Sequence, residues 1–285
     1  MNSSLVLKEL TIELSSKTII MGIVNVTPDS FSDGGMYTQG GPPETARAVD
    51  AALTMVDEGA DIIDVGGEST RPGSARVSAE EELDRVIPVI EGIRRHSSIP
   101  VSIDTYKSVV AVAAAKAGAS MINDISACRM DPEMAVTAAA TGCALVLMHM
   151  KGRPEDMQKD PAYVDVVSEV SGFLLERATA AEAAGVSKER ILIDPGIGFG
   201  KTVGHNLTLI NRLDILAALG YPVVLGVSRK AFIGSITGGA GPMDRLEGTL
   251  AACVAGIMRG ASILRVHDVS AVTKAAAVAD AVARA

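Results

Sequence analysis

The stretch EGADIIDV, residues 58–65, contains the unit from which most of the chain is built. A helix-like segment ends at its glycine, and a short apolar strand follows and finishes beside a carboxylate. Glycine at such a junction can take the left-handed conformation that ends a helix, without steric cost. The same junction recurs at residues 117–122, 141–148, 219–225 and 259–264. This repetition predicts helices that alternate with the buried strands of a parallel sheet.

Eight strands are expected in this pattern, and a helix follows each of them. We place the strands near residues 19–24, 61–65, 99–103, 119–123, 144–148, 191–194, 222–226 and 262–266. We place the helices near residues 43–58, 78–95, 106–117, 131–141, 162–184, 204–219, 243–259 and 269–284. Eight βα units over roughly 265 residues are the number found in a (β/α)8 TIM barrel. The sequence therefore predicts an α/β fold of this class, with an open doubly wound sheet as the alternative.

The segment before the first βα unit has a different pattern. Apolar and polar residues alternate over residues 4–18, which predicts a β-hairpin ahead of the main fold. No linker or low-complexity stretch divides the chain, so residues 1–285 are expected to form one barrel domain with the hairpin in residues 1–18. Irregular stretches all follow strand ends, where loops of this fold carry function; they lie at residues 27–43, 66–77, 150–161 and 228–242.

Composition and charge argue against several classes of protein. The net charge of −8 disfavours a nucleic-acid-binding surface, although a local basic cluster can still bind a small anionic substrate. The sequence has no run of about 18 uncharged apolar residues, so no membrane partner is expected. Charged residues interrupt the first apolar stretch, which makes it a poor secretion signal. The three widely spaced cysteines are expected to be buried free thiols of a cytoplasmic protein: Cys128, Cys143 and Cys253.

Polar side chains stand at the carboxyl end of every expected strand. In chain order these are Asn25, Asp64 with Glu68, Asp104, Asn123 with Asp124, His149, Asp194, Ser228 to Lys230, and Arg265 with His267. Asp104 or Asp124 taken alone has an alternative role as the cap of a helix or turn. A ring of such groups at one mouth of a barrel, however, is where this fold builds its active sites. The ring therefore favours a functional site over a set of unrelated caps.

The acidic half of this ring is suited to a nitrogen heterocycle. Asp104, Asn123 and Asp194 combine two carboxylates with an amide. Buried carboxylates are costly unless donors pair with them, and a flat ring such as a pterin or a guanine-like base offers several N–H groups. Lys230 is placed to reach the carbonyl group of such a ring.

The other half of the ring is expected to be cationic. Arg265 and His267, with Arg71 as a further candidate, suit a phosphate or diphosphate. Asn25 offers an oxygen to Mg²⁺, an ion that usually keeps several waters and uses substrate phosphates as ligands. A heterocycle beside a diphosphate indicates transfer of an activated group with diphosphate as the leaving group, and Mg²⁺ is the expected cofactor.

The stretch DPGIGFGKT, residues 194–202, is open to three interpretations. A phosphate-binding P-loop needs glycine five residues before Gly200, but Pro195 stands there and lacks an N–H. A dinucleotide-binding fingerprint also fails, because its third glycine falls on Lys201. We therefore interpret the stretch as a strand end that delivers Asp194 to the site, followed by a tight loop. Lys201 receives no role from this interpretation.

Ten motifs along the chain resemble, in order, those of the dihydropteroate synthase family. The two longest are MGIVNVTPDSFSDGG at 21–35 and DVGGESTRPG at 64–73. The others lie at residues 102–107, 122–126, 148–150, 194–202, 228–230, 232–234, 248–250 and 265–268. The resemblance covers roughly residues 19–270. It implies a TIM barrel that is usually a homodimer, and a transferase reaction of cytoplasmic folate biosynthesis.

The reaction that this resemblance implies joins 6-hydroxymethyl-7,8-dihydropterin diphosphate to p-aminobenzoate and gives 7,8-dihydropteroate and diphosphate. The pterin pocket falls on Asp104, Asn123, Ile125, Met148, Asp194, Phe199, Gly226 and Lys230. The diphosphate site falls on Asn25, Arg265 and His267, and the p-aminobenzoate site on Pro28, Phe31, Thr70, Arg71, Pro72 and Ser228. Mg²⁺ falls on Asn25, and the catalytic groups are Asp104, Asp194, Lys230, Arg265 and His267. Asp33 is a further candidate, either as a metal ligand or as a residue that orders the closed loop. Sulfonamides are expected to compete with p-aminobenzoate.

Two other kinds of pterin-binding barrel are the alternatives. A methyltetrahydrofolate–corrinoid methyltransferase has no diphosphate to bind, and a non-catalytic pterin-binding barrel would lack the diphosphate site. Arg265, His267 and the loop of residues 27–35 argue against the first alternative, and the presence of Asn25, Arg265 and His267 argues against the second. Ala127 departs from the family pattern, which usually has glycine there, and Ala231 stands where a larger or polar residue is common. Neither change removes a site group, so only the local shape of a loop is expected to differ.

Overall fold

The computed structural model describes residues 4–8, 10–27, 44–69, 76–152 and 156–285. Its strands are β1 (Ser4–Leu7), β2 (Leu10–Glu13), β3 (Ile19–Asn25), β4 (Ile62–Gly66), β5 (Val101–Asp104), β6 (Met121–Asp124), β7 (Ala144–Met148), β8 (Ile191–Asp194), β9 (Val224–Leu225) and β10 (Ile263–Val266). Its helices are α1 (Glu44–Asp57), α2 (Ala79–His96), α3 (Ser108–Ala117), α4 (Met134–Thr141), α5 (Val166–Ala183), α6 (Val203–Asn211), α7 (Leu213–Ala217), α8 (Ala231–Ile236), α9 (Leu246–Ile257) and α10 (Val269–Ala283), with short 3-10 turns η2 (Lys188–Arg190) and η3 (Pro242–Asp244). Within these described ranges, no helix is long and apolar enough to cross a membrane.

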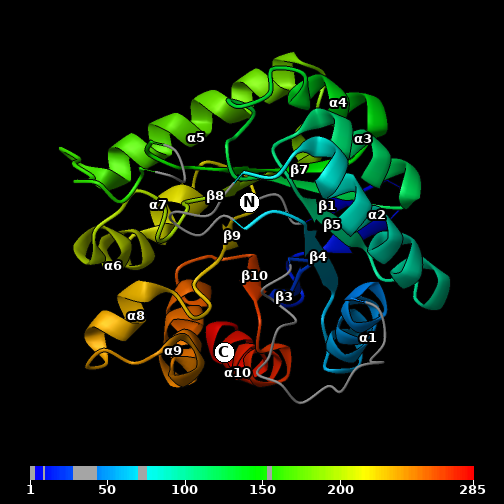
Figure 1. Cartoon of the computed structure of the whole chain (residues 1–285). Coiled ribbons are helices and arrows are strands. Elements are labelled where there is room, and N and C mark those ends of the chain that lie inside the picture. The colour runs from blue at the N-terminus through cyan, green and yellow to red at the C-terminus, as the bar shows by residue number, and fades with distance from the viewer. Residues whose placement is uncertain (1–3, 9, 28–43, 70–75, 153–155) are drawn as a thin grey trace.

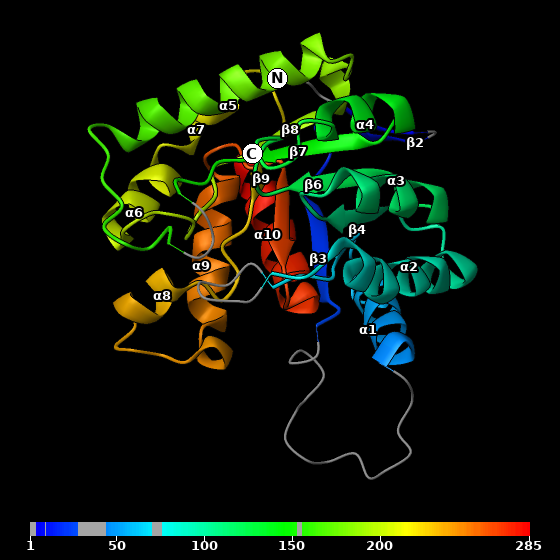
Figure 2. The same ribbon diagram turned by 45° about the horizontal axis from the view of Figure 1, so that its top comes forward.

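Strands β3 to β10 form one parallel sheet of eight strands that closes into a barrel. The strand order is β8-β7-β6-β5-β4-β3-β10-β9, in which β10 pairs with β3. A parallel bridge between Ile193 and Val223 closes the gap between β8 and β9, and there the Ile193 N–H donates to the Pro222 carbonyl at 3.0 Å. Helices surround the strands in Figure 1, and Figure 2 shows the same arrangement from a second angle. The closure confirms the predicted barrel and excludes the open sheet.

The N-terminal hairpin packs against the amino-terminal end of the barrel interior. β1 and β2 pair antiparallel, as the alternation over residues 4–18 predicts. Leu5 and Leu7 are buried and pack against inward-facing strand residues: Ile19, Met21, Ile62, Met121, Ala144, Val146, Leu192, Val224 and Ile263. Burial of a leucine side chain contributes about 1.5–3 kcal/mol to folding. This apolar cluster fills one end of the barrel, so the inward-facing polar side chains gather at the other end.

A second apolar layer separates the strands from the surrounding helices. Alternate strand residues face it, so that Ile63 and Val65 of β4 pack outward while Ile62 packs inside the barrel. The helices that cover this layer end at the predicted junctions. Gly118 and Gly142 follow α3 and α4 in the left-handed conformation, with φ of 114° and 67°. These two positions confirm the helix–glycine–strand unit expected from the sequence.

Two parts of the helical layer differ from the prediction. The single helix expected over residues 204–219 is divided into α6 and α7 at Arg212, whose φ of −112° and ψ of 27° interrupt it. The stretch at 228–242, expected to be irregular, contains the six-residue helix α8, which buries Phe232 and Ile233. A helix of this length spans less than two turns, so its sequence shows no helical period.

Ala127 has a backbone conformation that is unfavourable for alanine. Ala127 and Cys128 have φ of 52° and 60°, in a loop held by Asp124, whose carboxylate accepts the N–H groups of Ser126 and Cys128 at 2.7 Å each. The left-handed conformation costs a residue with a Cβ roughly 1–2 kcal/mol. Glycine removes this cost, but part of the gain is offset because glycine loses more conformational entropy on folding. We therefore expect Ala127→Gly to raise the free energy of unfolding by about 0.5–1 kcal/mol in urea titrations.

The control is the same substitution on the exposed face of helix α5, at Ala180. Glycine in a helix interior is less stable than alanine by roughly 0.5–1 kcal/mol, so Ala180→Gly should change the stability in the opposite direction. A loss of stability in the Ala127→Gly variant would contradict the strain assigned to this loop.

Candidate active site

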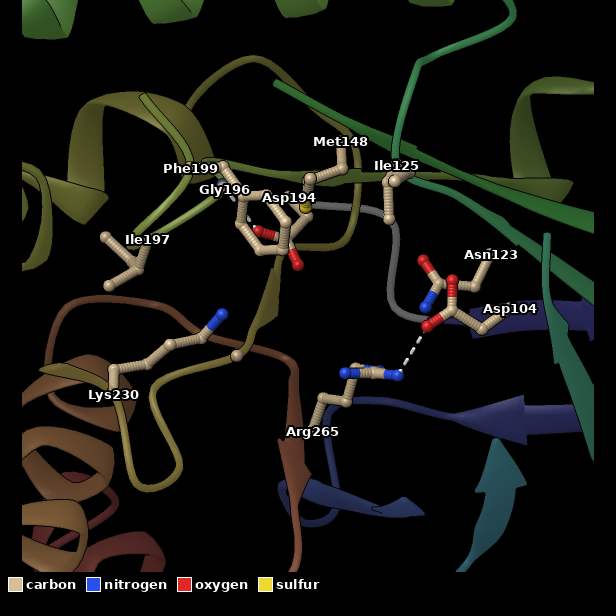
Figure 3. Close-up of a pocket in the computed structure, with 11 residues that line it drawn as sticks. Asp104, Asn123, Ile125, Met148, Asp194, Gly196, Ile197, Phe199, Lys230 and Arg265 are labelled. Atoms are coloured by element: carbon tan, nitrogen blue, oxygen red, sulfur yellow. Dashed lines mark hydrogen bonds and ion pairs between the residues drawn. The ribbon is translucent and has the colours of Figure 1, made fainter. Parts of the chain in front are cut away.

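The carboxyl ends of the strands surround a pocket at one mouth of the barrel (Figure 3). The lining residues are Asp104, Asn123, Ile125, Met148, Asp194, Gly196, Ile197, Phe199, Gly226, Lys230 and Arg265. The structure thus brings together all the residues that the sequence assigns to a pterin pocket. Gly196, Ile197 and Arg265 are additional lining residues that were not assigned to it.

Three hydrogen-bond acceptors reach this pocket from neighbouring strands. Asn123 of β6 donates its Nδ2 amide hydrogen to Asp64 Oδ2 at 3.0 Å, which leaves its Oδ1 available as an acceptor. Asp194 of β8 accepts the Gly196 N–H at 2.6 Å through Oδ1, and Asp104 at the end of β5 supplies a second carboxylate. Because all three groups accept, the pocket is complementary to a ligand that presents several N–H donors.

Arg265 connects two of these strand ends through ion pairs. Its Nε donates to Asp64 Oδ2 at 2.6 Å. Its Nη2 donates to Asp104 Oδ2 at 2.7 Å, and Figure 3 shows this second interaction. The side chain of Asp64 is fully buried, and that of Arg265 is 20% exposed. Burial opposes the charge of Arg265, but Asp64 and Asp104 outweigh this effect and raise the pKa of Arg265. The arginine therefore stays charged where it lines the pocket.

Asp64 contacts two of the residues that line the pocket, although the sequence assigns it no site role. One of its carboxylate oxygens accepts hydrogen bonds from both Asn123 and Arg265, so Asp64 orients two residues of the pocket. The sequence places Asp64 in the ring of strand ends but not among the site residues. The register of the sheet reveals this role. Asp64 of β4 pairs with Ser102 of β5, so it lies at the level of the residue two positions before Asp104.

Burial shifts the protonation equilibria of the pocket. It raises the pKa of Asp104 to about 7, against the lowering effect of Arg265. Burial also raises the pKa of Asp194, and the Gly196 hydrogen bond and the charge of Lys230 partly offset that rise. For Lys230 burial lowers the pKa to about 8, and its Nζ lies 4.3 Å from the centroid of the Phe199 ring. Groups that titrate near neutral pH are typical of functional sites.

His267 lies beside the pocket as a neutral side chain. Its Nδ1 is 3.0 Å from Ser228 Oγ, and its backbone N–H donates to the same hydroxyl at 3.2 Å. In the tautomer with the ring proton on Nε2, the hydroxyl donates to Nδ1 while it accepts the backbone N–H. Burial and the charge of Arg265 lower the pKa of His267 to about 3. The expectation of a cationic histidine is wrong for the ligand-free protein, because desolvation and the guanidinium both disfavour imidazolium.

The three side chains of the Ser228–Lys230 segment point to different partners. Ser228 contacts His267, and Lys230 lines the pocket. Arg229 forms a bidentate pair with Asp268, with Nη2 to Oδ1 at 2.5 Å and Nε to Oδ2 at 3.0 Å. This pair links the loop after β9 to the loop after β10, so it holds Lys230 and His267 at a fixed separation.

Asn25 lies at the end of β3, near Asp104. A Cβ added to Gly66 would lie 3.8 Å from Asn25 Oδ1 and 3.7 Å from Asp104 Oδ2, so both oxygens lie close to the same point. Within the described ranges, no group of three or more His, Cys, Asp or Glu side chains could hold a metal ion. A Mg²⁺ ion that takes most of its ligands from water and substrate phosphates needs only one or two protein oxygens. Asn25 therefore fits that kind of site.

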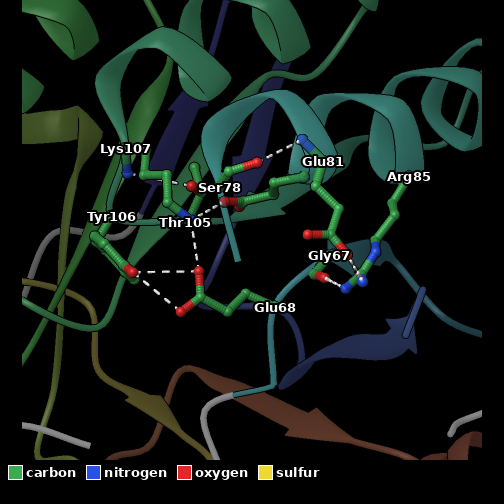
Figure 4. Close-up of polar contacts among 9 residues, drawn as sticks. Gly67, Glu68, Ser78, Glu81, Arg85, Thr105, Tyr106 and Lys107 are labelled. Atoms are coloured by element: carbon green, nitrogen blue, oxygen red, sulfur yellow. Dashed lines mark hydrogen bonds and ion pairs between the residues drawn. The ribbon is translucent and has the colours of Figure 1, made fainter. Parts of the chain in front are cut away.

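Glu68 belongs to a polar cluster outside the pocket (Figure 4). Lys107 Nζ contacts Glu68 at 2.5 Å and also pairs with Glu82, and the Tyr106 hydroxyl donates to Glu68 at 3.0 Å. Lys107 and Tyr106 follow β5, whereas Glu68 follows β4. The cluster joins two neighbouring segments at the rim of the barrel, and none of its residues lines the pocket.

Two further members of the predicted ring also have partners elsewhere. Asp124 accepts backbone N–H groups of the turn that follows it, which is the capping role considered as its alternative. His149 Nδ1 is 2.9 Å from the Nζ of Lys201, a lysine that is only 3% exposed. Burial and the charge of Lys201 lower the pKa of His149 to about 3, so Nδ1 accepts the hydrogen bond.

Several predicted site residues lie outside the described part of the chain. They are the loop residues assigned to p-aminobenzoate and to the metal: Pro28, Phe31, Asp33, Thr70, Arg71 and Pro72. Ser228 is the one p-aminobenzoate residue within the described ranges, and its contact with His267 puts it next to the predicted diphosphate site.

The fold and the pocket together define a barrel enzyme that binds a flat, N–H-rich heterocycle beside a cationic group. Comparison with known families agrees with this class, because the family described as "Pterin binding enzyme" matches residues 21–267. The dihydropteroate synthase of Bacillus subtilis strain 168 is 47% identical over 274 residues, which cover 96% of this chain and 92% of that protein.

Solved structures support the same assignment. The Xanthomonas albilineans dihydropteroate synthase with 4-aminobenzoic acid is 48% identical, with a TM-score of 0.90 and coverage of 99% of this chain and 98% of that one. The Yersinia pestis dihydropteroate synthase in a sulfonamide drug complex is 41% identical, with a TM-score of 0.91 and coverage of 99% and 100%. The chain belongs to the dihydropteroate synthase family.

Proposed function

We propose that the protein condenses 6-hydroxymethyl-7,8-dihydropterin diphosphate with p-aminobenzoate and releases 7,8-dihydropteroate and diphosphate, a step of folate biosynthesis. The observation that carries this proposal is the pocket itself. Asp104, Asn123 and Asp194 face Lys230 across it, with Arg265 at its edge. Family membership gives the same activity independently of the pocket.

The pterin ring is proposed to lie between the acceptors and the apolar walls of the pocket. Its N–H groups donate to the two carboxylates and to Asn123 Oδ1, and Lys230 donates to its carbonyl oxygen. Ile125, Met148 and Phe199 form one apolar cluster of buried side chains, which suits the faces of a flat ring. Gly226 contributes no side chain, so the backbone of the β9 end can approach the ring closely.

The diphosphate is proposed to bind beside Arg265, His267 and Asn25. Two of the five N–H donors of a guanidinium are taken by Asp64 and Asp104, and the remaining donors can bind phosphate oxygens. His267 serves as a neutral donor through Nε2. We also propose that Asn25 contributes an oxygen to Mg²⁺, with Asp33 outside the described residues as a further candidate ligand. When bound, Mg²⁺ adds positive charge that stabilises the departing diphosphate.

The pocket favours a substitution in which the bond to the leaving group breaks first. The C–O bond to diphosphate breaks, diphosphate leaves with the electron pair, and the dihydropterin ring shares the positive charge that remains at its exocyclic CH2. Asp104 and Asp194, as anions against the ring N–H groups, stabilise this charge, and Arg265 stabilises the leaving group. The nitrogen of p-aminobenzoate then attacks the CH2 carbon and loses a proton to solvent. A neutral aniline is already a nucleophile, so no strong general base is needed.

The direct test is an assay for dihydropteroate formation from both substrates, with and without Mg²⁺. We expect product in the presence of Mg²⁺ and a large loss of rate when the ion is chelated. Absence of product under all conditions would contradict the proposed reaction, and an unchanged rate after chelation would contradict only the metal. Sulfonamides are expected to raise the KM for p-aminobenzoate without changing kcat, as competitive inhibitors do.

Pterin binding is expected to weaken as the pH falls below about 7. Asp104 has a raised pKa of about 7, so it becomes protonated on the acid side and then no longer accepts a ring N–H as an anion. One pH unit below that pKa, the affinity for 6-hydroxymethylpterin should be about tenfold lower. On the alkaline side Lys230, with a pKa of about 8, loses its charge and binding should weaken again. Fluorescence titrations from about pH 5 to pH 9 measure both limbs.

The Asp104→Asn variant is the control for this pH profile. Asparagine does not titrate, so the acid limb should disappear while the alkaline limb stays. An acid limb of unchanged shape in the variant would assign that titration to a different group.

We also propose that the protein is a homodimer that uses the face formed by α9 and α10. An apolar groove there is lined by Val254, Met258, Ala275, Val278, Ala279 and Val282. Met258, Val278 and Val282 are 49%, 66% and 61% exposed, and exposed apolar clusters of this kind are typical of protein interfaces. Sedimentation should give a dimer of the 29.4 kDa chain for the wild type and a monomer for Val278→Asp.

Val109 of α3 is the matched control, because it is a similarly exposed helical valine away from this groove. Val109→Asp should remain dimeric, and a monomeric wild type would contradict the proposal. We further propose a cytoplasmic location, which the three buried, unpaired cysteines support.

A further inference from the structure

Lys201 is a buried lysine that the proposed reaction does not use. It is 3% exposed and does not line the pterin pocket. Its Nζ contacts the Phe199 carbonyl at 3.0 Å, His149 Nδ1 at 2.9 Å and the His149 carbonyl at 3.4 Å. An ammonium group has three N–H donors, so these three acceptors account for all of them. A lysine so buried and so fully bonded is held in one position.

The contacts of Lys201 join two segments that both border the pocket. Phe199 belongs to the loop that follows β8 and lines the pocket, whereas His149 follows Met148 at the end of β7. The two segments also meet through the His149 N–H, which donates to the Asp194 carbonyl at 3.0 Å. A side chain at Gly196 would begin 1.9 Å from the His149 carbonyl oxygen, so the loop lies directly on this backbone.

The charge of Lys201 lies among neutral acceptors. Among the described residues, its hydrogen-bond partners are two carbonyl groups and an imidazole, and none is a carboxylate. Burial lowers the pKa of Lys201 to about 7, and Asp194 counteracts this effect as the attractive charge. Burial raises the pKa of Asp194, and the charge of Lys201 is one of several effects that oppose this rise. The lysine thus acts on one pocket residue by its charge and on another by a hydrogen bond.

Phe199 is the residue through which these effects reach the ligand. Lys201 binds its backbone carbonyl, and the ammonium of Lys230 lies over its ring. Gly198 and Gly200, on both sides of it, have φ of 84° and 64°, a region that glycine adopts freely, so hydrogen bonds hold the loop in place. Besides the bond from Lys201, the Gly198 N–H donates to Asn206 and the Tyr163 hydroxyl donates to the Gly200 carbonyl. The orientation of the ring therefore depends on contacts such as that of Lys201.

We propose that Lys201 is a positioning residue for the pterin subsite: its ammonium group fastens the loop of residues 194–202 to the end of β7 and thereby holds the Phe199 ring and the Asp194 carboxylate in their binding positions. This inference rests on the proposed function, in which these two groups bind the pterin. It accounts for the lysine in a glycine-rich stretch that resembles a phosphate-binding loop but lacks its spacing.

The test compares Lys201→Met with wild type and with Lys151→Met. Methionine keeps the length of the apolar stem but removes the charge and all three donors. Lys151 is the matched control, because it lies two residues after His149 and its side chain is 45% exposed beside Glu169. Among the described residues, its Nζ binds the Ala162 carbonyl and lies over the Tyr163 ring, and it makes no hydrogen bond to the loop of residues 194–202. Circular dichroism and thermal unfolding establish that each variant is folded. Lys201→Gln, which keeps an N–H donor without the charge, is the second variant if methionine prevents folding.

The readouts are the Kd for 6-hydroxymethylpterin and the KM values for both substrates. A displaced pocket wall typically weakens a site by about tenfold to a hundredfold, and we expect this loss for pterin in Lys201→Met. The KM for p-aminobenzoate should stay within about twofold, and Lys201→Gln should lie between Lys201→Met and wild type. Lys151→Met should bind like wild type. Unchanged pterin affinity in the folded Lys201 variants, or an equal loss for both substrates, would overturn the proposal.

A spectroscopic measurement separates this inference from the proposed function. The chain has four phenylalanines, so fluorophenylalanine labelling gives few ¹⁹F signals, and Phe199→Leu assigns the one of interest. In ligand-free Lys201→Met the Phe199 signal should shift or broaden, and in Lys151→Met it should not. If wild type makes no dihydropteroate but this signal behaves as expected, the function fails and the positioning role stands. A Phe199 signal identical to that of wild type shows that Lys201 does not position the ring.

Discussion

Replacing Arg265 with alanine is expected to damage both the activity and the stability of the protein. Asp64 is fully buried, and it would lose the cation that binds its Oδ2 at 2.6 Å; its Oδ1 is already buried without a hydrogen-bond partner among the described residues. Removing one partner of a buried ion pair typically costs about 3–5 kcal/mol, because the other charge remains. The loss of a donor to the departing diphosphate should lower kcat about 10²- to 10³-fold. Denaturant unfolding and steady-state kinetics measure the two effects.

The comparison of Arg265→Ala with Arg265→Lys separates charge from geometry. Lysine keeps a positive charge but cannot bind Asp64 and Asp104 at once in the manner of a planar guanidinium. We therefore expect Arg265→Lys to recover much of the stability and little of the activity. Adding Asp64→Asn to the alanine variant removes the unpaired carboxylate and should restore part of the lost stability. An alanine variant as stable as wild type would show that these ion pairs contribute nothing net to folding.

The repeated unit made the architecture of this chain predictable. Each helix-ending glycine is followed by an apolar strand. The number of these units is the only feature of the pattern that favours a closed barrel over an open sheet. The barrel closes where Ile193 bridges to Val223 and its N–H donates to the Pro222 carbonyl, and no local sequence pattern encodes these contacts. Helix α8 is not predictable in this way, since its two buried apolar side chains, Phe232 and Ile233, are too few to show a helical period.

The candidate pocket was predictable to the extent that strand ends share one mouth of the barrel. Asp104, Asn123 and Asp194 are placed there by topology alone, because parallel strands all end on the same side. Which polar residue turns inward is a different question. Glu68 and His149 also follow strands, yet the first pairs with Lys107 and the second with Lys201. These contacts join residues that lie tens of positions apart in the chain, so the spacing of residues within a motif does not predict them.

Protonation states were the least accessible to sequence reasoning. Arginine next to histidine suggested two cations, but the histidine cannot keep its charge where it is desolvated and faces Arg265. The same principle explains Asp104, whose pKa rises through burial although an arginine contacts it. Residue types identify the class of ligand, whereas burial and neighbouring charges determine which groups are ionised when it arrives.

Gly226→Val is expected to abolish pterin binding while leaving the fold intact. A Cβ added at Gly226 would lie 4.0 Å from Asp194 Oδ2 and 4.0 Å from Arg265 Cβ, which are ordinary contacts. Valine is also favourable at the end of a strand. Its methyl groups, however, would extend into the space that the ring is proposed to occupy. A ligand displaced by about 1 Å can lose a hundredfold, and direct overlap should cost at least about that much in kcat/KM.

Side chains of increasing size at position 226 should weaken pterin binding progressively. Gly226→Ala should give an intermediate Kd for 6-hydroxymethylpterin, Gly226→Val should give no measurable binding, and both should unfold within about 1 kcal/mol of wild type. Gly172→Ala, an exposed helical position with no atom within 4 Å of the added carbon, should leave binding and turnover unchanged. Wild-type turnover by a folded Gly226→Val variant would mean that the pterin does not lie against β9. In that case the acceptors of Asp104 and Asp194 would have to bind a ligand in some other orientation.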